Sequence, residues 1–207
     1  MVSICLTIDN YFLNRECIEN MLSRCKENEV ELLVSNNTFD GKASEYINRI
    51  IKDEKFYHVK RVGEIDEFIL NRATAINRLL SETRGDYICV FDSSAMVSNG
   101  WLYDLKYFHS LINNSGITAI PEFNTKKVYS PLMDKNDEFV NVWKPELNYV
   151  SGILFFKKEH LKLTGCFSDV SENYVELFSK QFVNAGFENF YIPGQICILT
   201  KQKIKTQ

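Results

Sequence analysis

The sequence contains little proline and glycine and no long uninterrupted hydrophobic run. Its 207 residues include only 4 prolines and 9 glycines, a composition that excludes collagen-like and low-complexity chains. The longest apolar stretches, such as 87–91 and 153–156, are far shorter than the roughly 20 residues of a membrane-spanning helix. The first ten residues carry Asp9 and have no charged segment before their apolar run, so they are expected to form a strand and not a secretion signal. We therefore expect a cytoplasmic protein without a transmembrane segment, for which peripheral membrane contact stays open.

The chain also lacks an excess of either charge and any paired cysteine motif. It has 24 Lys and Arg against 27 Asp and Glu, so no basic field favours nucleic acid, and a small ligand fits better. The six cysteines are scattered, without a C-x-x-C pair and with mostly apolar neighbours. This pattern predicts reduced, buried thiols and argues against a disulfide framework or a zinc site.

In the first half, apolar runs typical of buried strands alternate regularly with segments whose apolar residues have helical spacing. Apolar runs predict buried strands at 3–8, 30–34, 56–59 and 87–91. Helical spacing predicts amphipathic helices at 17–25, 43–51, 68–80 and 101–112. Such alternation implies right-handed crossovers and a mostly parallel, Rossmann-like sheet with helices on both faces, hence an α/β fold.

The second half, from about residue 117, shows a less regular pattern. Strand-like pieces at 117–120, 128–130, 149–156, 190–192 and 196–200 surround one amphipathic helix near 175–185. This half is predicted to form a smaller, mixed and partly antiparallel region. We expect a single domain, because no linker separates the two halves and the length suits one core.

Polar residues follow three of the predicted strands, where a parallel α/β sheet binds its ligands. They are Thr7, Asp9 and Asn10 after the first strand, residues 35–41 after the second, and residues 92–94 after the 87–91 strand. The coincidence predicts a ligand site at the carboxyl edge of the sheet.

The segment Gly85-Asp86-Tyr87-Ile88-Cys89-Val90-Phe91-Asp92-Ser93-Ser94, followed by Gly100-Trp101-Leu102, resembles the GT-A glycosyltransferases, particularly family 2. Their pattern is G-D-Y-I-x-F-x-D-x-D and then P-G-W-L. Further segments resemble the family in the same order: residues 3–10, residues 31–41, Asn77, residues 150–152, residues 164–169 and residues 185–187. The resemblance covers nearly the whole chain.

This resemblance implies one GT-A domain over 1–207, with a nucleotide-binding half at 1–115 and an acceptor-side half at 116–207. It implies an enzyme that transfers a sugar, with inversion, from a nucleotide-diphosphate sugar, a UDP-sugar first, to a glycan, lipid-linked or protein hydroxyl. The nucleotide-sugar contacts that it implies are Thr7, Asp9, Asn10, Asn36, Thr38, Asp40, Asn77, Asp92 and Ser94. Ser35 stands where the family usually carries an aspartate.

The resemblance also implies Mn²⁺ or Mg²⁺ bound to the donor diphosphate, with Asp92 as the protein ligand. Here Ser94 replaces the second acid of the motif, and a neutral hydroxyl is a poorer ligand for a hard dication. Six of the arginines, Arg15, Arg49, Arg61, Arg72, Arg78 and Arg84, are candidates for a phosphate clamp or for helix-surface charges.

The general base is expected among Asp169, Glu172 and Glu176, near the family's acidic pair, whose own positions hold Asn173 and Tyr174. The alternative interpretation of these acids is a solvated helix N-terminus. For residues 36–40 the alternative is a turn held by Asx-type bonds. 

A second hypothesis for the whole chain is a catalytically inactive GT-A domain that binds a nucleotide sugar or a protein partner. A pyrophosphorylase-like enzyme is disfavoured, because residues 7–16 lack its Gly-rich, basic loop. Tyr103, Tyr107 and Phe123 are candidate exposed aromatics for a homo-oligomer interface or an acceptor groove.

Overall fold

The computed structural model describes residues 1–8, 11–25, 30–38, 41–52, 58–61, 71–122, 125–146, 149–169, 172–195 and 198–199. Asp9, Asn10, Asp40, Phe123 and Cys197 lie outside these ranges.

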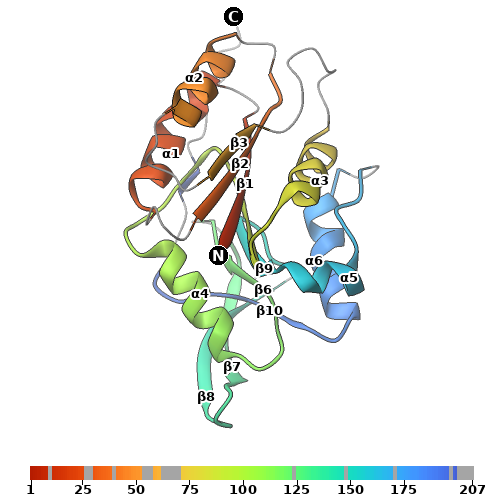
Figure 1. The fold of residues 1–207 in the computed structure, drawn as a ribbon. Helices are drawn as coiled ribbons and strands as arrows, with labels where there is room; N and C mark the ends of the chain where they lie inside the picture. Colours follow the sequence, from red (N-terminus) through yellow and green to blue (C-terminus); the bar gives the residue numbers. More distant parts are fainter. Residues whose placement is uncertain are drawn as a thin grey trace, which may run out of the picture.

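Strands and helices alternate through the first half, as the sequence predicts (Figure 1). The elements are β1 (Val2–Ile8), α1 (Tyr11–Ser23), β2 (Val30–Asn36), α2 (Gly41–Lys52), β3 (His58–Arg61), α3 (Arg72–Glu82), β4 (Tyr87–Phe91), β5 (Ala95–Met96) and α4 (Trp101–Leu111). The second half adds β6 (Ser115–Ile120), β7 (Lys127–Met133), β8 (Phe139–Pro145), β9 (Ile153–Lys157), η2 (Lys158–His160), α5 (Leu161–Thr164), α6 (Tyr174–Asn184), β10 (Glu188–Tyr191) and β11 (Ile198–Leu199).

The described strands form a nine-stranded sheet in the order β3-β2-β1-β4-β9-β6-β10-β8-β7, and β5 pairs separately with β11. The four strands β3, β2, β1 and β4 are all parallel. β9 then runs antiparallel between β4 and β6, and the β7–β8 hairpin closes the sheet at its edge. The α/β fold with a parallel first half and a mixed second half is confirmed.

The antiparallel insertion of β9 matters for the site. Val90 near the end of β4 pairs with Leu154 near the start of β9. The carboxyl end of β4 therefore lies beside the amino end of β9, and the residues that follow β4 meet the residues that precede β9.

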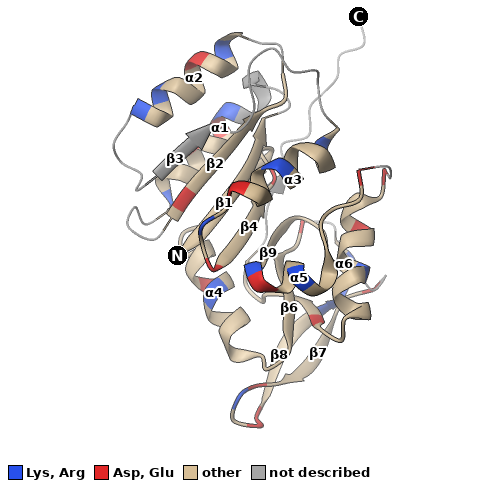
Figure 2. Cartoon of the chain, turned by 45° about the vertical axis from the view of Figure 1, so that its right-hand side comes forward, with Lys and Arg blue, Asp and Glu red and all other residues tan. Residues whose placement is uncertain are grey.

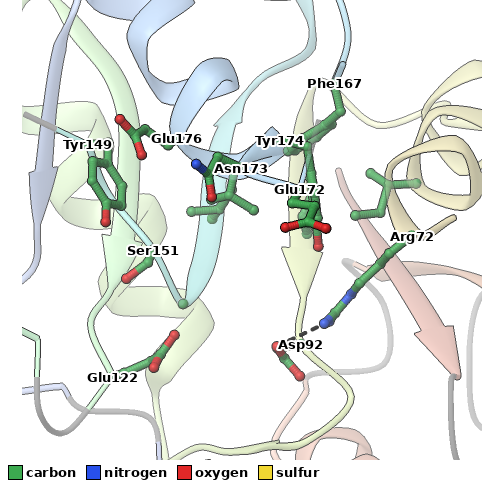
Figure 3. Close-up of a pocket in the computed structure, with 15 residues that line it drawn as sticks. Arg72, Asp92, Glu122, Tyr149, Ser151, Phe167, Glu172, Asn173, Tyr174 and Glu176 are labelled. Carbon is green, nitrogen blue, oxygen red and sulfur yellow. Dashed lines mark ion pairs between the residues drawn. The ribbon is translucent and has the colours of Figure 1, made fainter. Parts of the chain in front are cut away.

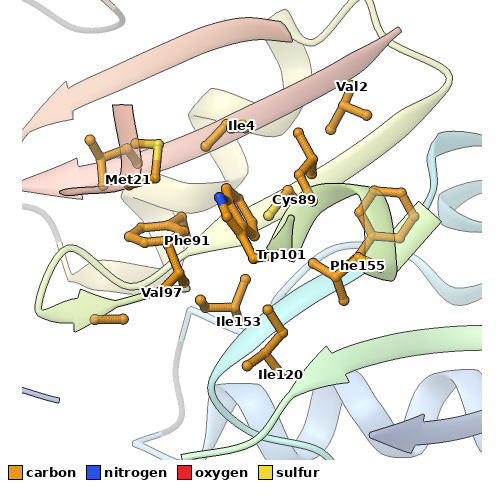
Figure 4. Packing of buried hydrophobic residues seen from close by; sticks show 14 of the residues in the cluster. Val2, Ile4, Met21, Cys89, Phe91, Val97, Trp101, Ile120, Ile153 and Phe155 are labelled. Atoms are coloured by element: carbon orange, nitrogen blue, oxygen red, sulfur yellow. The ribbon is translucent and has the colours of Figure 1, made fainter. Parts of the chain in front are cut away.

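Helices cover both faces of the sheet, and each face has its own apolar core (Figure 1). Alternate residues of β1 enter one core with α1, α2 and α4, where Trp101 is fully buried against Phe91 at 5.5 Å between ring centroids (Figure 4). On the other face, α3 and α6 cover the sheet, and Phe178 and Phe182 of α6 contact Phe156 of β9. Burial of these rings is the main stabilising contribution to the fold.

The turn before β4 requires glycine at position 85. A Cβ atom there would lie 2.7 Å from Ser3 Oγ and 2.8 Å from the carbonyl oxygen of Met1. Gly85 N donates to Ser3 Oγ at 2.8 Å, and Ser3 Oγ donates to the buried carboxylate of Glu31 at 2.6 Å. The glycine of the Gly-Asp-Tyr segment therefore serves close packing of β4 against β1.

The structure differs from the prediction in one strand and one cysteine. The strand β8 was not predicted, because only Val142 among its seven residues is buried and the edge strand shows little alternation. Cys166 is exposed, whereas Cys5, Cys17 and Cys89 are buried as expected. All five described cysteines are free thiols, and burial raises the pKa of Cys25 to about 12.

Charges of both signs are distributed over the helices and the hairpin (Figure 2). Among the described helices, none is long and apolar enough to cross a membrane. Tyr103 and Tyr107 are exposed on α4 and stack on each other at 6.2 Å between ring centroids.

Candidate functional site

A cleft of about 220 Å³ opens where β4 ends (Figure 3). Its walls come from the start of α3, the residues after β4 and β6, the segment before β9, and the first turn of α6. The lining residues are Arg72, Ile76, Val90, Asp92, Glu122, Tyr149, Ser151, Gly152, Leu154, Phe167, Glu172, Asn173, Tyr174, Val175 and Glu176. Both halves of the chain therefore contribute to one cleft.

Asp92 follows β4 directly, so the strand fixes its position. Its Oδ1 accepts hydrogen bonds from Ser94 N at 2.9 Å and from Ser94 Oγ at 2.6 Å. Its Oδ2 lies 3.1 Å from Nη2 of Arg72. Partial burial alone would raise the pKa of Asp92, but the Arg72 charge and the Ser94 hydrogen bonds outweigh it and hold the pKa below its usual range. Asp92 is therefore a charged, firmly oriented carboxylate.

Arg72 is the first residue of α3, and the residue before it anchors the helix. Asn71 accepts a hydrogen bond from Thr74 N at 2.8 Å, which is the N-cap bond of α3. The side-chain amide of Asn71 also donates to the carbonyl oxygen of Asp169, just ahead of α6. Arg72 thus projects toward Asp92 from a backbone that is tied to both halves of the chain (Figure 3).

Three further carboxylates line the cleft from the second half. Glu172 lies just before α6, Glu176 lies in the first turn of α6, and Glu122 follows β6 by two residues. Glu176 pairs with Lys180 one turn along the helix at 2.5 Å, and its side chain is 28% exposed. The side chain of Glu172 is exposed at the mouth of the cleft. Glu122 lies across the cleft from Asp92, whereas the carboxylate of Glu176 points toward Tyr149 (Figure 3).

The segment before β9 is held in place by two buried side chains. Val150 N donates to Ser179 Oγ on α6 at 3.0 Å, and Ser151 N donates to the hydroxyl of Tyr191 on β10 at 3.0 Å. Burial raises the pKa of Tyr191, so this phenol stays neutral and able to accept the bond. The backbone at Tyr149–Gly152 is therefore a fixed wall of the cleft.

The predicted nucleotide side lies at the ends of β1 and β2. Thr7 is buried and pairs in register with Ser35, and Leu6 before it pairs with Phe91, so Thr7 and Asp92 lie at the same edge. Asn36 accepts hydrogen bonds from Thr38 N and Thr38 Oγ1 at 3.2 and 3.1 Å, the Asx-type turn of the alternative interpretation. The other predicted contacts on these two loops, Asp9, Asn10 and Asp40, are outside the described residues.

Several predicted residues do not line the cleft. Asn77 exchanges two hydrogen bonds with the backbone of Phe167, at 2.7 and 3.0 Å. Asp169 is exposed, and only its carbonyl oxygen has a described hydrogen bond. Ser94 contacts Asp92 but is likewise absent from the lining residues. Their roles toward a ligand stay predictions.

The residues around Asp92 do not fit a divalent cation. Asp92 already faces a guanidinium, and Ser94 offers a hydroxyl that is engaged with the same carboxylate. Within the described ranges, no group of three or more His, Cys, Asp or Glu side chains could hold a metal ion. A Mn²⁺ or Mg²⁺ site needs several oxygen ligands and a net negative donor set, which Asp92 paired with Arg72 does not provide.

Sequence reasoning did not single out Arg72 or Glu122. The signal for Glu122 is similar to the one that identified Asp92, since Glu122 stands two residues after a buried strand. The signal for Arg72 is weaker, because one arginine among six is distinguished only by the tertiary contact that it makes.

No protein-family model and no curated protein sequence matches the chain. Solved structures do match. The mannosyltransferase PcManGT from Pyrobaculum calidifontis, in complex with GDP-Man and Mn²⁺, superposes with a TM-score of 0.76 at 14% identity, over 99% of this chain and 58% of that one. S. aureus TarS 1–349 in complex with UDP-GlcNAc has a TM-score of 0.70 at 15% identity, over 98% of this chain and 59% of that one.

GalNAc-T7 with UDP, GalNAc and Mn²⁺ has a TM-score of 0.71 at 10% identity, over 98% of this chain and 44% of that one. The chain thus spans less than two thirds of the length of each of these structures. At these identities the likeness is one of fold, and it confirms the expected GT-A fold.

Proposed function

We propose that this chain is a glycosyltransferase, which moves a sugar from a nucleotide-diphosphate sugar to a hydroxyl group of a glycan or lipid-linked acceptor. The observation that carries the proposal is the cleft itself. It combines a charged Asp92 at the carboxyl end of a parallel strand with carboxylates from the opposite half of the chain. A transferase needs this division, because the donor and the acceptor must meet between the two halves.

The donor would occupy the edge formed by β1, β2 and β4. Thr7 and Asn36 would contact the base, and Asp92 would contact the ribose. The similar structures support this class of donor, since they are complexes with GDP-Man, UDP-GlcNAc and UDP. We take a UDP-sugar as the first donor to test.

The reaction would be a single displacement with inversion at the anomeric carbon. The acceptor oxygen forms the new bond to that carbon, and its proton passes to a carboxylate of the cleft. The bond from the anomeric carbon to the diphosphate oxygen breaks, and its electron pair leaves with the nucleoside diphosphate. Glu172 and Glu176 are the proposed bases, and Glu122 is a third candidate that lines the same cleft.

Donor turnover tests this proposal directly. Release of UDP from UDP-GlcNAc and UDP-glucose, and of GDP from GDP-mannose, would be measured with and without an oligosaccharide acceptor, in EDTA and in Mn²⁺. We expect Asp92→Ala to abolish nucleotide binding. One of Glu172→Gln, Glu176→Gln and Glu122→Gln should lower turnover by about 10²–10⁴-fold while nucleotide binding persists.

Glu159→Gln is the matched control, since Glu159 is 68% exposed and pairs with Lys157 away from the cleft. Failure of every nucleotide to bind would overturn the proposal.

The substitutions at Ser35, Asn173 and Tyr174 favour a second candidate, a GT-A domain that binds a nucleotide sugar without turnover. Saturable UDP binding without UDP release from any donor would support that candidate. Turnover that is lost in Asp92→Ala would exclude it.

A further inference from the structure

We propose that Arg72 supplies the positive charge that faces the donor diphosphate, so that nucleotide-sugar binding by this chain needs no divalent cation. The inference rests on the proposed function and deepens it. It starts from the disagreement between the fold, in which similar structures hold Mn²⁺, and the residues that this chain places around Asp92.

The first step is the charge of the site. A motif with two acids presents two negative charges, which a dication neutralises together with the diphosphate. Here Ser94 removes one of these charges, and Arg72 at 3.1 Å balances the other. A dication placed beside Asp92 would also lie next to a guanidinium, which repels it. The same guanidinium attracts the diphosphate of a donor.

The second step is position and reach. Arg72 lines the cleft, its side chain is 31% exposed, and it projects from the first turn of α3. Asn71 fixes that turn through its bonds to Thr74 N and the carbonyl oxygen of Asp169. The guanidinium is thus held at the opening of the cleft and not on a freely moving surface chain.

The third step is bonding geometry. A guanidinium carries five N–H donors in a planar fork, which matches the oxygens of a phosphate as well as those of a carboxylate. Asp92, itself oriented by Ser94 N and Oγ, would hold the fork in the orientation that meets the ligand. Asp92 is then a positioning residue for Arg72, in place of a metal ligand.

The experiment separates a diphosphate contact from a purely structural ion pair. Calorimetric titration would compare UDP with uridine, and GDP with guanosine, in EDTA and in Mn²⁺. The ratio of the affinities of the nucleoside diphosphate and its nucleoside measures what the diphosphate contributes. In the unmodified chain we expect this ratio to be the same within about twofold with EDTA and with Mn²⁺.

Arg72→Gln should reduce the ratio by about ten- to a hundredfold while nucleoside affinity is retained, since charge-assisted bonds to phosphate are lost. Arg72→Lys, which keeps the charge but not the fork, should give an intermediate ratio. Retained nucleoside binding also reports that each variant is folded. The matched control is Arg84→Gln, because Arg84 is an exposed arginine at the opposite end of β4.

Three outcomes would overturn the inference. Diphosphate binding at least tenfold tighter in Mn²⁺ than in EDTA would contradict it and leave the proposed glycosyltransferase function standing. An unchanged ratio in Arg72→Gln would show that the arginine serves only the fold. Absence of binding by both nucleotides and nucleosides would overturn the proposed function as well.

Discussion

The side-chain amide of Asn77 and the backbone of Phe167 bond to each other twice. Asn77 Nδ2 donates to Phe167 O at 2.7 Å, and Phe167 N donates to Asn77 Oδ1 at 3.0 Å. The two residues are 90 positions apart, on α3 and on the segment that leads to α6. This pair joins the two halves of the chain behind the wall of the cleft.

Asn77→Ala should therefore lower the free energy of unfolding by about 1–3 kcal/mol, because a partly buried N–H and C=O of Phe167 lose their partner. Urea denaturation measures the change. Asn99→Ala is the matched control, since Asn99 is exposed, and it should stay within about 0.5 kcal/mol of the unmodified chain. Equal stability of the two variants would contradict the linking role of Asn77.

The same variant bears on the predicted nucleotide contact of Asn77. Both ends of its amide are engaged with Phe167, so we expect UDP affinity to change by less than about threefold. A larger loss in a variant that remains folded would favour direct contact with the ligand.

Gly85→Ala tests the close approach of β4 to β1. The added methyl group would meet Ser3 Oγ at 2.7 Å and the Met1 carbonyl at 2.8 Å, and backbone cannot yield easily. We expect a loss of about 1–3 kcal/mol in unfolding free energy. Gly41→Ala is the control, because a Cβ there has no neighbour within 4 Å and the residue begins a helix. A stable Gly85→Ala protein would mean that β1 and β4 can separate slightly without cost.

Much of the fold could be predicted because β1, β2 and β4 are mainly apolar segments between amphipathic helices. β1, for example, is buried at every residue. The antiparallel place of β9 could not be predicted, since a buried strand has the same pattern in either direction. That placement puts Ser151 and Asp92 in the same cleft, so this wall of the cleft could not be predicted from the sequence.

The candidate site was predictable to a similar degree. Asp92 was predictable because an acid directly after a buried strand marks the ligand edge of the sheet. The pairing of Arg72 with Asp92 depends on where α3 begins, and the helical spacing of apolar residues extends back to residue 68, ahead of the N-cap Asn71, so it does not mark that start. Glu122 follows the same rule as Asp92, but the strand before it belongs to the less regular half.

Asp92 should also make stability depend on pH. Its pKa in the folded protein lies below its usual value, so near pH 3–4 the unfolded chain binds a proton that the folded protein does not. The stabilisation is complete above that range and is lost as pH falls through the folded pKa. We expect the stability difference between the unmodified chain and Asp92→Asn to be about 1–3 kcal/mol at pH 6 and smaller at pH 3. Urea denaturation at the two values measures it, and a pH-independent difference would contradict the ion pair.

His109 is a second source of pH dependence, remote from the cleft. It is 1% exposed on α4, and its Nδ1 lies 2.9 Å from Thr118 Oγ1 and 3.0 Å from Ser115 Oγ. Burial, reinforced by the charges of His160, Lys157 and Lys135, lowers the pKa of His109 to about 3. The folded protein therefore keeps this imidazole neutral at pH values where the unfolded chain is protonated.

This difference in protonation of His109 destabilises the folded protein at acidic pH. As pH falls below the unfolded value near 6.5, the unfolded chain gains a proton and the folded protein becomes less stable, by about 2 kcal/mol between pH 7 and pH 5. His109→Gln should remove this part of the pH dependence while keeping a polar side chain near Ser115 and Thr118. The ring centroid of His160 lies 6.3 Å from that of His109, and burial lowers the pKa of His160 as well. The variant His160→Gln therefore separates the contribution of this second imidazole to the pH dependence. If the stability of His109→Gln falls between pH 7 and pH 5 as steeply as that of the unmodified chain, His109 accepts its proton without unfolding, and the buried neutral state is wrong.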